Sequence, residues 1–117
     1  MAVTTIDELI GEWQVQDVGG TGVIEDSDPA LVLTAEGRIS GSTGLNRLAG
    51  SYEFADGELR CTPLAMTRMA GPAELMAQEA RFMAALERPA PVRLDGWRLI
   101  LGDGRRSLVL ARIADPG

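Results

Sequence analysis

The stretch Gly41-Ser42-Thr43-Gly44-Leu45-Asn46-Arg47-Leu48-Ala49-Gly50-Ser51-Tyr52 decides how the rest of the chain folds. It holds three glycines, each of which destabilises a helix by roughly 1 kcal/mol relative to alanine. In a strand, glycines mark bulges, bends or close approaches of the backbone. The stretch therefore predicts a kinked strand that carries one polar pair, Asn46 and Arg47, into an apolar neighbourhood.

A second unusual stretch, Leu64–Pro72, opens the one helix that the sequence predicts, over about 72–88. Proline suits the first position of a helix, and the prolines at 89 and 91 end it. We expect the two stretches to face each other. The apolar positions of the helix are Leu75, Met76, Phe82, Met83 and Leu86.

Glu79 occupies the position that is missing from this apolar stripe, four residues after Leu75. A carboxylate on a buried helix face is costly without a partner. We therefore expect Glu79 to be buried. Its expected partner is an arginine, with Arg68 as the first choice, or backbone amides of residues 41–50 or 64–71.

Short strands separated by Xaa-Gly turns lie on both sides of the helix. Apolar and polar residues alternate with period two in Gly11–Val18, which is typical of a half-buried strand. Similar strands are expected over 30–34, 38–41, 46–54, 58–66, 92–94, 97–101 and 107–113. In 97–101 the alternation predicts that Trp97, Leu99 and Leu101 face inward.

Eight short antiparallel strands favour a mainly β fold, a meander that closes into a small barrel, with the helix between the fifth and sixth strands. A meander of this length has two edges to protect. We therefore expect Gly11–Val18 to pair with Ser107–Ile113 and close the sheet.

The composition fits one globular domain over residues 1–117. No apolar run approaches the ~18 residues of a membrane span, and no signal-peptide pattern opens the chain, so we expect a cytoplasmic protein without membrane insertion. The net charge of −6 argues against nucleic-acid binding. The chain has no histidine, which removes the commonest general base and metal ligand.

One polar constellation stands out, and it comprises Asn46, Arg47, Thr67, Arg68 and Glu79. It is interpreted either as a ligand site, in which arginines bind an acidic ligand and Glu79 acts as acid or base, or as a structural network between helix and strand. A single carboxylate without a second acid, a histidine or a nucleophile favours the structural interpretation. The sequence predicts no catalytic residue and no cofactor.

The single Cys61 excludes an internal disulfide and is interpreted as a small buried hydrophobe rather than a nucleophile. The acidic loop Glu25–Asp28 lacks the spaced ligands of an EF-hand, so no metal site is predicted. Four methionines have two interpretations, as fillers of gaps in the core or as the lining of a soft ligand pocket. They are Met66, Met69, Met76 and Met83.

Several motifs occur in a specific order: Trp13, Gly44-Leu45-Asn46-Arg47, Gly50-Ser51-Tyr52, Thr67-Arg68-Met69-Ala70-Gly71, and Gln78-Glu79 with Phe82. In these motifs the chain resembles the META domain family, whose members are also described as heat-shock protein HslJ-like. The resemblance extends from about Gly11 to Ile113. The resemblance implies a compact β-barrel-like domain with one helix and a loose link to stress and envelope phenotypes. It implies no reaction.

The chain departs from the family at two positions. Leu45 and Gly71 stand where the family often has cysteines, so any role of those thiols is absent here. The loss of both fits a reducing compartment. If family members join these positions, Leu45 and Gly71 lie close together, with the leucine packed over the glycine.

Three functional hypotheses follow from these observations, and an enzyme is the least favoured of them. The first is a non-enzymatic accessory domain that acts through its surface on a protein partner, in stress tolerance. The second is a small-molecule-binding β-barrel that uses its interior or the mouth beside the helix. A pocket of a few hundred Å³ lined by Met and Leu favours the second. A filled interior with an exposed apolar patch favours the first.

Overall fold

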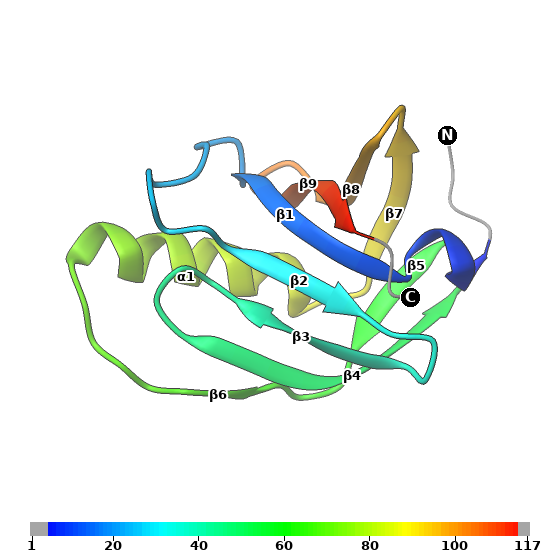
Figure 1. Cartoon of the computed structure of the whole chain (residues 1–117), viewed down its shortest axis with the longest axis horizontal. Coiled ribbons are helices and arrows are strands. Elements are labelled where there is room, and N and C mark those ends of the chain that lie inside the picture. The colour runs from blue at the N-terminus through cyan, green and yellow to red at the C-terminus, as the bar shows by residue number, and fades with distance from the viewer. Residues whose placement is uncertain (1–4, 115–117) are drawn as a thin grey trace.

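A computed structural model of the chain describes residues 5–114, which form a β-barrel with one α-helix (Figure 1). The elements, in chain order, are a 3-10 helix (Ile6–Glu8), β1 (Gly11–Val18), β2 (Ala30–Leu33), β3 (Arg38–Ser42), β4 (Arg47–Ala55), β5 (Glu58–Cys61), β6 (Ala65–Met66), α1 (Ala73–Leu86), β7 (Ala90–Asp95), β8 (Arg98–Asp103) and β9 (Arg106–Ala114).

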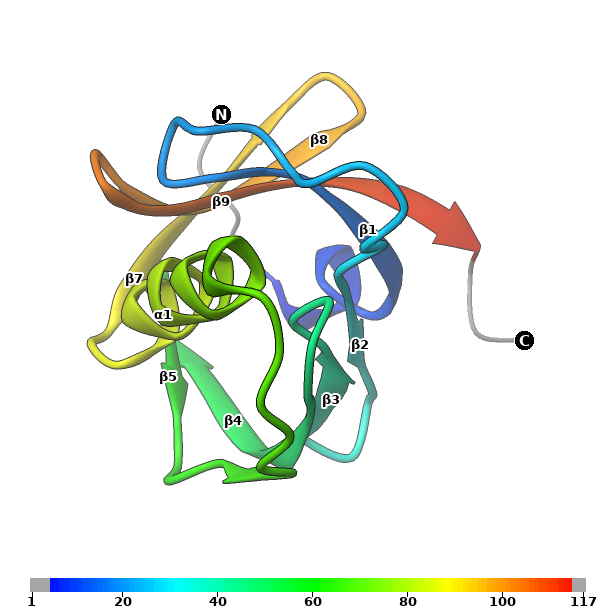
Figure 2. The same ribbon diagram turned by 90° about the vertical axis from the view of Figure 1, so that its left-hand side faces the viewer.

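Eight antiparallel strands close the barrel in the order β3-β2-β1-β9-β8-β7-β5-β4, and β4 then returns to pair with β3. The first and last strands pair as predicted, with Trp13 opposite Arg112 and Val18 opposite Leu108. β6 is an additional strand that pairs with β4. Figure 2 looks along α1 and shows the strands arranged around it, so the helix occupies one end of the barrel.

Large apolar side chains fill the interior between the sheet and α1. In β1 the predicted alternation is confirmed, because Trp13 and Val15 are buried whereas the alternating polar residues are exposed, namely Glu12, Gln14 and Gln16. The Trp13 indole donates a hydrogen bond of 2.9 Å to the Leu9 carbonyl, which satisfies its polar atom inside the core. The largest buried apolar side chains include Trp13, Leu31, Leu33, Ile39, Leu59, Phe82, Leu99, Leu101, Leu108 and Leu110.

The prediction that Trp97 faces inward is wrong, although Leu99 and Leu101 are buried as expected. Trp97 is 62% exposed because it belongs to the turn between β7 and β8. Asp95 pairs with Arg98, which leaves Gly96 and Trp97 as the two turn residues. The Arg98 guanidinium lies 5.1 Å from the centre of the Trp97 ring, over its face.

The strand predicted over 58–66 is two strands, so α1 follows the sixth strand rather than the fifth. β5 ends at Cys61 and β6 begins at Ala65, and Pro63 between them has no N–H to donate to a ladder. α1 lies inside its predicted range. Within residues 5–114 no helix is long and apolar enough to cross a membrane.

Candidate functional site

Asn46 is the centre of a polar network between α1 and the two stretches that the sequence singles out. Its side chain is 3% exposed. Nδ2 donates to Glu79 Oε1 at 2.9 Å and to the Met69 carbonyl at 3.1 Å. Oδ1 accepts from Thr67 Oγ1 at 2.9 Å and from the Met69 amide at 2.7 Å. One amide side chain therefore holds the 67–69 segment and the helix to the start of β4.

Thr43 is buried beside Asn46 and shares its partner. Its hydroxyl donates to Glu79 Oε1 at 2.9 Å and accepts from the backbone amides of Leu45 and Asn46 at 3.2 and 3.0 Å. The Glu79 carboxylate is half-buried and is stabilised by these two neutral donors of the 43–46 turn. Sequence reasoning did not place Thr43 in the constellation.

Gln78 is a second residue of the site that sequence reasoning missed. It is buried, and its Oε1 accepts from the Ile24 amide at 2.8 Å. Its Nε2 donates to the Thr43 carbonyl at 3.0 Å and to Ser27 Oγ at 3.1 Å. A usable signal was present, because Gln78 precedes Phe82 by four residues and so shares its helix face.

The arginines do not join the network through their side chains. Arg47 and Arg68 are both exposed. Arg47 contributes only backbone groups, with its amide donating to Thr67 Oγ1 at 3.0 Å. The predicted contact between Glu79 and Arg68 is wrong, and so is the full burial of Glu79. The structure thus brings Asn46, Thr67 and Glu79 together and leaves Arg68 outside.

Leu45 packs over Gly71, as predicted. A Cβ atom added at Gly71 would lie 2.6 Å from Leu45 Cδ1, which is too close for an undisturbed contact. Gly71 does not have the positive φ that would strain a side chain at this position. The contact fixes the segment before α1 against the turn that carries Asn46.

The model of the META domain family matches residues 7–115. The chain belongs to the META domain family. The motifs that carry the resemblance to the family also build the polar network. Asn46, Thr67, Gln78 and Glu79 all lie in these motifs, and the side chain of each forms a hydrogen bond in the network. A search of curated proteins finds no match for this META domain.

Solved structures share the fold of this META domain. A protein structure determined by NMR is 26% identical, with a TM-score of 0.76 over 93% of this chain and 96% of that one. An NMR structure of a protein from Burkholderia xenovorans is 24% identical, with a TM-score of 0.68 over 97% and 94% of the two chains. A crystal structure of a DUF4847 family protein from Bacteroides vulgatus is 14% identical, with a TM-score of 0.64 over 97% and 100%.

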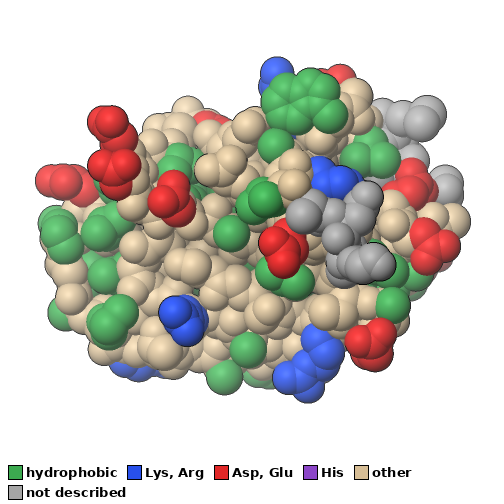
Figure 3. Space-filling model, in the orientation of Figure 1, with side chains coloured by type: hydrophobic (Ala, Val, Ile, Leu, Met, Phe, Trp, Pro, Cys, Tyr) green, Lys and Arg blue, Asp and Glu red, His purple; other side chains and the backbone are tan. Residues whose placement is uncertain are grey.

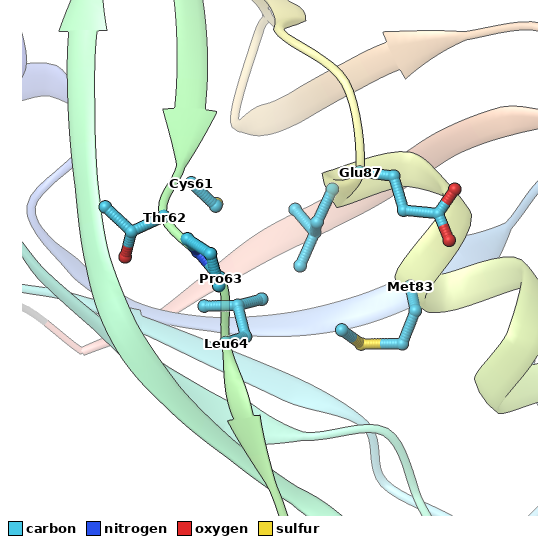
Figure 4. A pocket seen from close by; sticks show the side chains of 7 residues that line it. Cys61, Thr62, Pro63, Leu64, Met83 and Glu87 are labelled. Carbon is cyan, nitrogen blue, oxygen red and sulfur yellow. The ribbon is translucent and has the colours of Figure 1, made fainter.

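A hollow of about 290 Å³ lies between α1 and the segment that joins β5 to β6 (Figure 4). In Figure 4, Leu64 and Met83 point toward each other across it, whereas the Glu87 carboxylate points away. Burial raises the pKa of the Cys61 thiol to about 11, so the thiol stays protonated at neutral pH. The hollow is lined by Cys61, Thr62, Pro63, Leu64, Met83, Leu86 and Glu87.

The four methionines divide between core and surface. Met66 and Met83 pack against the core, in line with the gap-filling interpretation. Met69 and Met76 are 61% and 49% exposed, so that interpretation is wrong for them. Met76 and Met83 lie seven residues apart and share one side of α1. We call the exposed apolar residues here the α1 apolar surface, which comprises Met69, Ala73, Met76, Ala77, Ala80 and the adjoining half-buried Met83.

Acidic side chains lie near the start of α1 (Figure 3). Gln78 binds the loop at Ile24 and Ser27 to the helix, and this loop carries the exposed Glu25, Asp26 and Asp28. Figure 3 shows hydrophobic side chains gathered over the start of α1, with acidic side chains beside them. This end of the molecule therefore combines flexible apolar side chains with acidic ones, and the exposed Arg68 next to Met69 is a cation of the same region.

Proposed function

We propose that this META domain is a non-enzymatic accessory protein that acts through its surface, and that the α1 apolar surface binds a positively charged amphipathic segment of a partner protein. The exposure of Met69 and Met76 carries the proposal. Exposed apolar patches on soluble proteins commonly mark interaction sites. The link to stress tolerance is supported by the resemblance to HslJ-like proteins.

Methionine suits a surface that accepts varied apolar side chains, because its unbranched chain and polarisable sulfur adapt to different shapes. The surface also continues along α1. Met83 lies seven residues after Met76 and lines the hollow with Leu64 and Leu86. An apolar side chain of the partner can therefore enter the hollow while its neighbours cover Met76.

Charge complementarity selects the partner. The first 37 residues contain eight acidic residues and no basic one, and three of these acids lie in the loop that Gln78 holds against α1. On α1 itself, Glu74 is exposed in the first turn, and the first cation is Arg81. A segment that is apolar on one face and basic on the other satisfies both features.

The polar network supports a role without catalysis. Glu79 Oε1 is engaged by Thr43 and Asn46, and no histidine is present anywhere in the chain. The Cys61 thiol, with a pKa of about 11, is a poor nucleophile at neutral pH. The network is explained by its contacts, which hold α1 and two loops in place.

A helical peptide of leucine and lysine serves as the probe, and binding to the full chain is measured by calorimetry. We expect the double substitution Met69→Gln with Met76→Gln to weaken binding at least about tenfold. Trp97→Gln is the matched control, because it removes an exposed hydrophobic residue elsewhere and should leave binding unchanged. A leucine–glutamate peptide should bind more weakly than the leucine–lysine peptide.

Two results would overturn the proposal. One is equal binding of the leucine–lysine peptide by the wild type and the Met69→Gln, Met76→Gln variant. The other is equal binding of the two peptides, which would remove the role of charge. High salt should weaken binding of the basic peptide, since the surface acids are screened.

A small-molecule-binding barrel is the second candidate, and the hollow beside α1 favours it. Its volume of about 290 Å³ and its Met and Leu lining fit a small apolar ligand. Indole is a suitable probe by NMR. Cys61→Leu fills the hollow and should abolish indole binding, whereas Cys61→Ala should preserve it. Equal binding by both variants would place indole elsewhere and remove this candidate.

A further inference from the structure

Four neighbouring strands, β7, β8, β9 and β1, present an apolar stripe on the outside of the barrel. On β8 and β9 the outward residues alternate with buried leucines, and the apolar ones are Ile100, Val109, Ala111 and Ile113. Ile100 lies opposite Val109 in the ladder, which makes the stripe continuous across the two strands. α1 packs against the inner side of these strands, so the helix and the stripe lie on opposite sides of the sheet (Figure 2). We call this surface the β7–β1 outer face.

Trp97 extends the stripe at the turn of the β7–β8 hairpin, which projects from the barrel in Figure 1. Arg98 lies opposite Ala111, so Trp97 and Ile113 are at the same end of the two strands. Arg98 is exposed, and its guanidinium over the Trp97 ring holds the ring at this face. Trp97 and Ile113 are 62% and 56% exposed, and within residues 5–113 the other large hydrophobic side chains that are exposed belong to the α1 apolar surface.

Charges of opposite sign flank the stripe. One row across the four strands consists of Arg93, Ile100, Val109 and Asp17. This row begins with an exposed cation on β7, crosses two apolar side chains and ends with an acid on β1. The neighbouring row consists of Asp95, Arg98, Ala111 and Gln14. In these rows the β7–β8 side carries two arginines and one acid, whereas β1 carries Asp17 and the exposed Glu12 and contains no arginine or lysine.

We propose that the β7–β1 outer face binds a second copy of the chain and forms a two-fold dimer. An axis along the boundary between β8 and β9 places β8 of each copy over β9 of the other, and β7 over β1. Ile100 then meets Val109 of the second copy, and Arg93 meets Asp17. An occupant of this face must be apolar in the middle, acidic opposite Arg93 and basic opposite Asp17. The chain itself carries that pattern, which makes a second copy the matching occupant.

Trp97 and Ile113 contribute most of the binding energy in this arrangement. The same axis places Trp97 of each copy against Ile113 of the other, and aromatic side chains are enriched among the residues that dominate interfaces. Because Arg98 already holds the ring, little side-chain entropy is lost on association. β7 and β8 are each six residues long, so the face measures about 15 by 20 Å, at the lower end of stable interfaces. We therefore expect a dissociation constant on the order of 10–100 µM.

Sedimentation velocity of the full chain measures the dimer. Over protein concentrations from about 1 µM to about 1 mM, which bracket the expected constant, the monomer should convert to a dimer and to nothing larger. The double substitution Trp97→Gln with Ile113→Gln should weaken dimerisation at least about tenfold. The double substitution Met69→Gln with Met76→Gln is the matched control, because it removes two exposed side chains from the α1 apolar surface and should leave dimerisation unchanged. Circular dichroism verifies that each variant is folded.

Charge reversal tests the arrangement of the two copies. Gln16 is exposed on β1 beside Asp17, which is left unchanged because its carboxylate accepts two backbone amides of the following loop. Arg93→Glu and Gln16→Arg each bring like charges together between two identical chains, so each variant alone should dimerise about tenfold more weakly. An equimolar mixture should restore dimerisation, because the new acid of one variant faces the new cation of the other. Arg38→Glu is the charge-matched control on β3, two strands beyond β1.

A chain that stays monomeric throughout this concentration range would refute the dimer. So would an equal loss of dimerisation in the methionine variant and in Trp97→Gln with Ile113→Gln, which would place the contact at the α1 apolar surface. An equimolar mixture that stays monomeric would exclude the two-fold arrangement. None of these outcomes depends on whether the α1 apolar surface binds a peptide, so the dimer and the proposed function are tested separately.

Discussion

Asn46 donates a hydrogen bond of 2.9 Å from Nδ2 to Oε1 of Glu79, and this bond joins the start of β4 to the middle of α1. The two residues are 33 positions apart in the chain. Because the other end of the Asn46 amide binds Thr67 and Met69, the same side chain also fixes the segment that leads into the helix.

Asn46→Ala should lower the free energy of unfolding by roughly 2–4 kcal/mol. The substitution leaves the Met69 amide without its acceptor and removes one of the two donors to Glu79, and buried groups that lose partners cost about 1–3 kcal/mol each. Urea unfolding followed by circular dichroism measures the change. Glu79→Gln is the milder comparison, because the Oε1 of the glutamine still accepts from Asn46. A loss of unfolding free energy in Glu79→Gln as large as that in Asn46→Ala would contradict this account.

Leu45→Cys combined with Gly71→Cys should form a disulfide and raise the melting temperature. The leucine that would collide with a side chain at position 71 is removed, and the backbone of Gly71 accepts an L-residue. The bond would close a loop of roughly 25 residues, which corresponds to about 3 kcal/mol if the geometry is unstrained. Thiol titration and melting under oxidising and reducing conditions test it, in a Cys61→Ala background. No rise on oxidation would show that the two positions are misaligned.

Removal of residues 108–117 should abolish cooperative folding. These residues include most of β9, which pairs with β1 on one side and β8 on the other. The truncated chain would expose two strand edges and lose the buried Leu108 and Leu110. Thermal unfolding followed by circular dichroism is the measurement. A truncated chain that still melts cooperatively would show that barrel closure is dispensable.

Burial of Cys61 should make stability depend on pH in the alkaline range. Its pKa rises from 9.0 to about 11, so the folded state favours the neutral thiol. The resulting stabilisation is fully present below pH 9 and is lost as the pH rises through 11. Comparison of the wild type with Cys61→Ala by urea unfolding across this range isolates the effect from Tyr52, whose pKa is also raised by burial. Parallel pH profiles of the two proteins would contradict it.

The parts of the fold that follow from local pattern were predictable. Alternation in β1 follows from its half-buried sheet face, and the pairing of β1 with β9 follows from the need to protect edges. Trp97 was misplaced because alternation does not distinguish a strand residue from the adjacent turn residue. The break in the 58–66 strand depends on how β4 shares its ladder between β5 and β6, which is a tertiary property.

The site was predictable in part for a related reason. Asn46 and Glu79 stand out as polar residues in apolar surroundings, so their involvement could be inferred. The partner of Glu79 could not, because charge alone suggests an arginine, whereas the long side chain of Arg68 remains in solvent. Neutral donors from Thr43 and Asn46 reach the carboxylate instead, and only the conformation of the 43–46 turn brings them there.

The junction between β5 and β7 determines how the barrel responds to thermal fluctuation. Only two residue pairs connect these strands, and one of them contains Pro91, which has no amide hydrogen. β1 and β9, by contrast, are joined by six residue pairs, with two register shifts along the ladder. The barrel is closed, yet the number of residue pairs that join neighbouring strands differs from one strand pair to the next. Hydrogen exchange should therefore be fastest at this seam, and breathing motions there would widen the adjoining hollow beside Cys61 before any other part of the barrel opens.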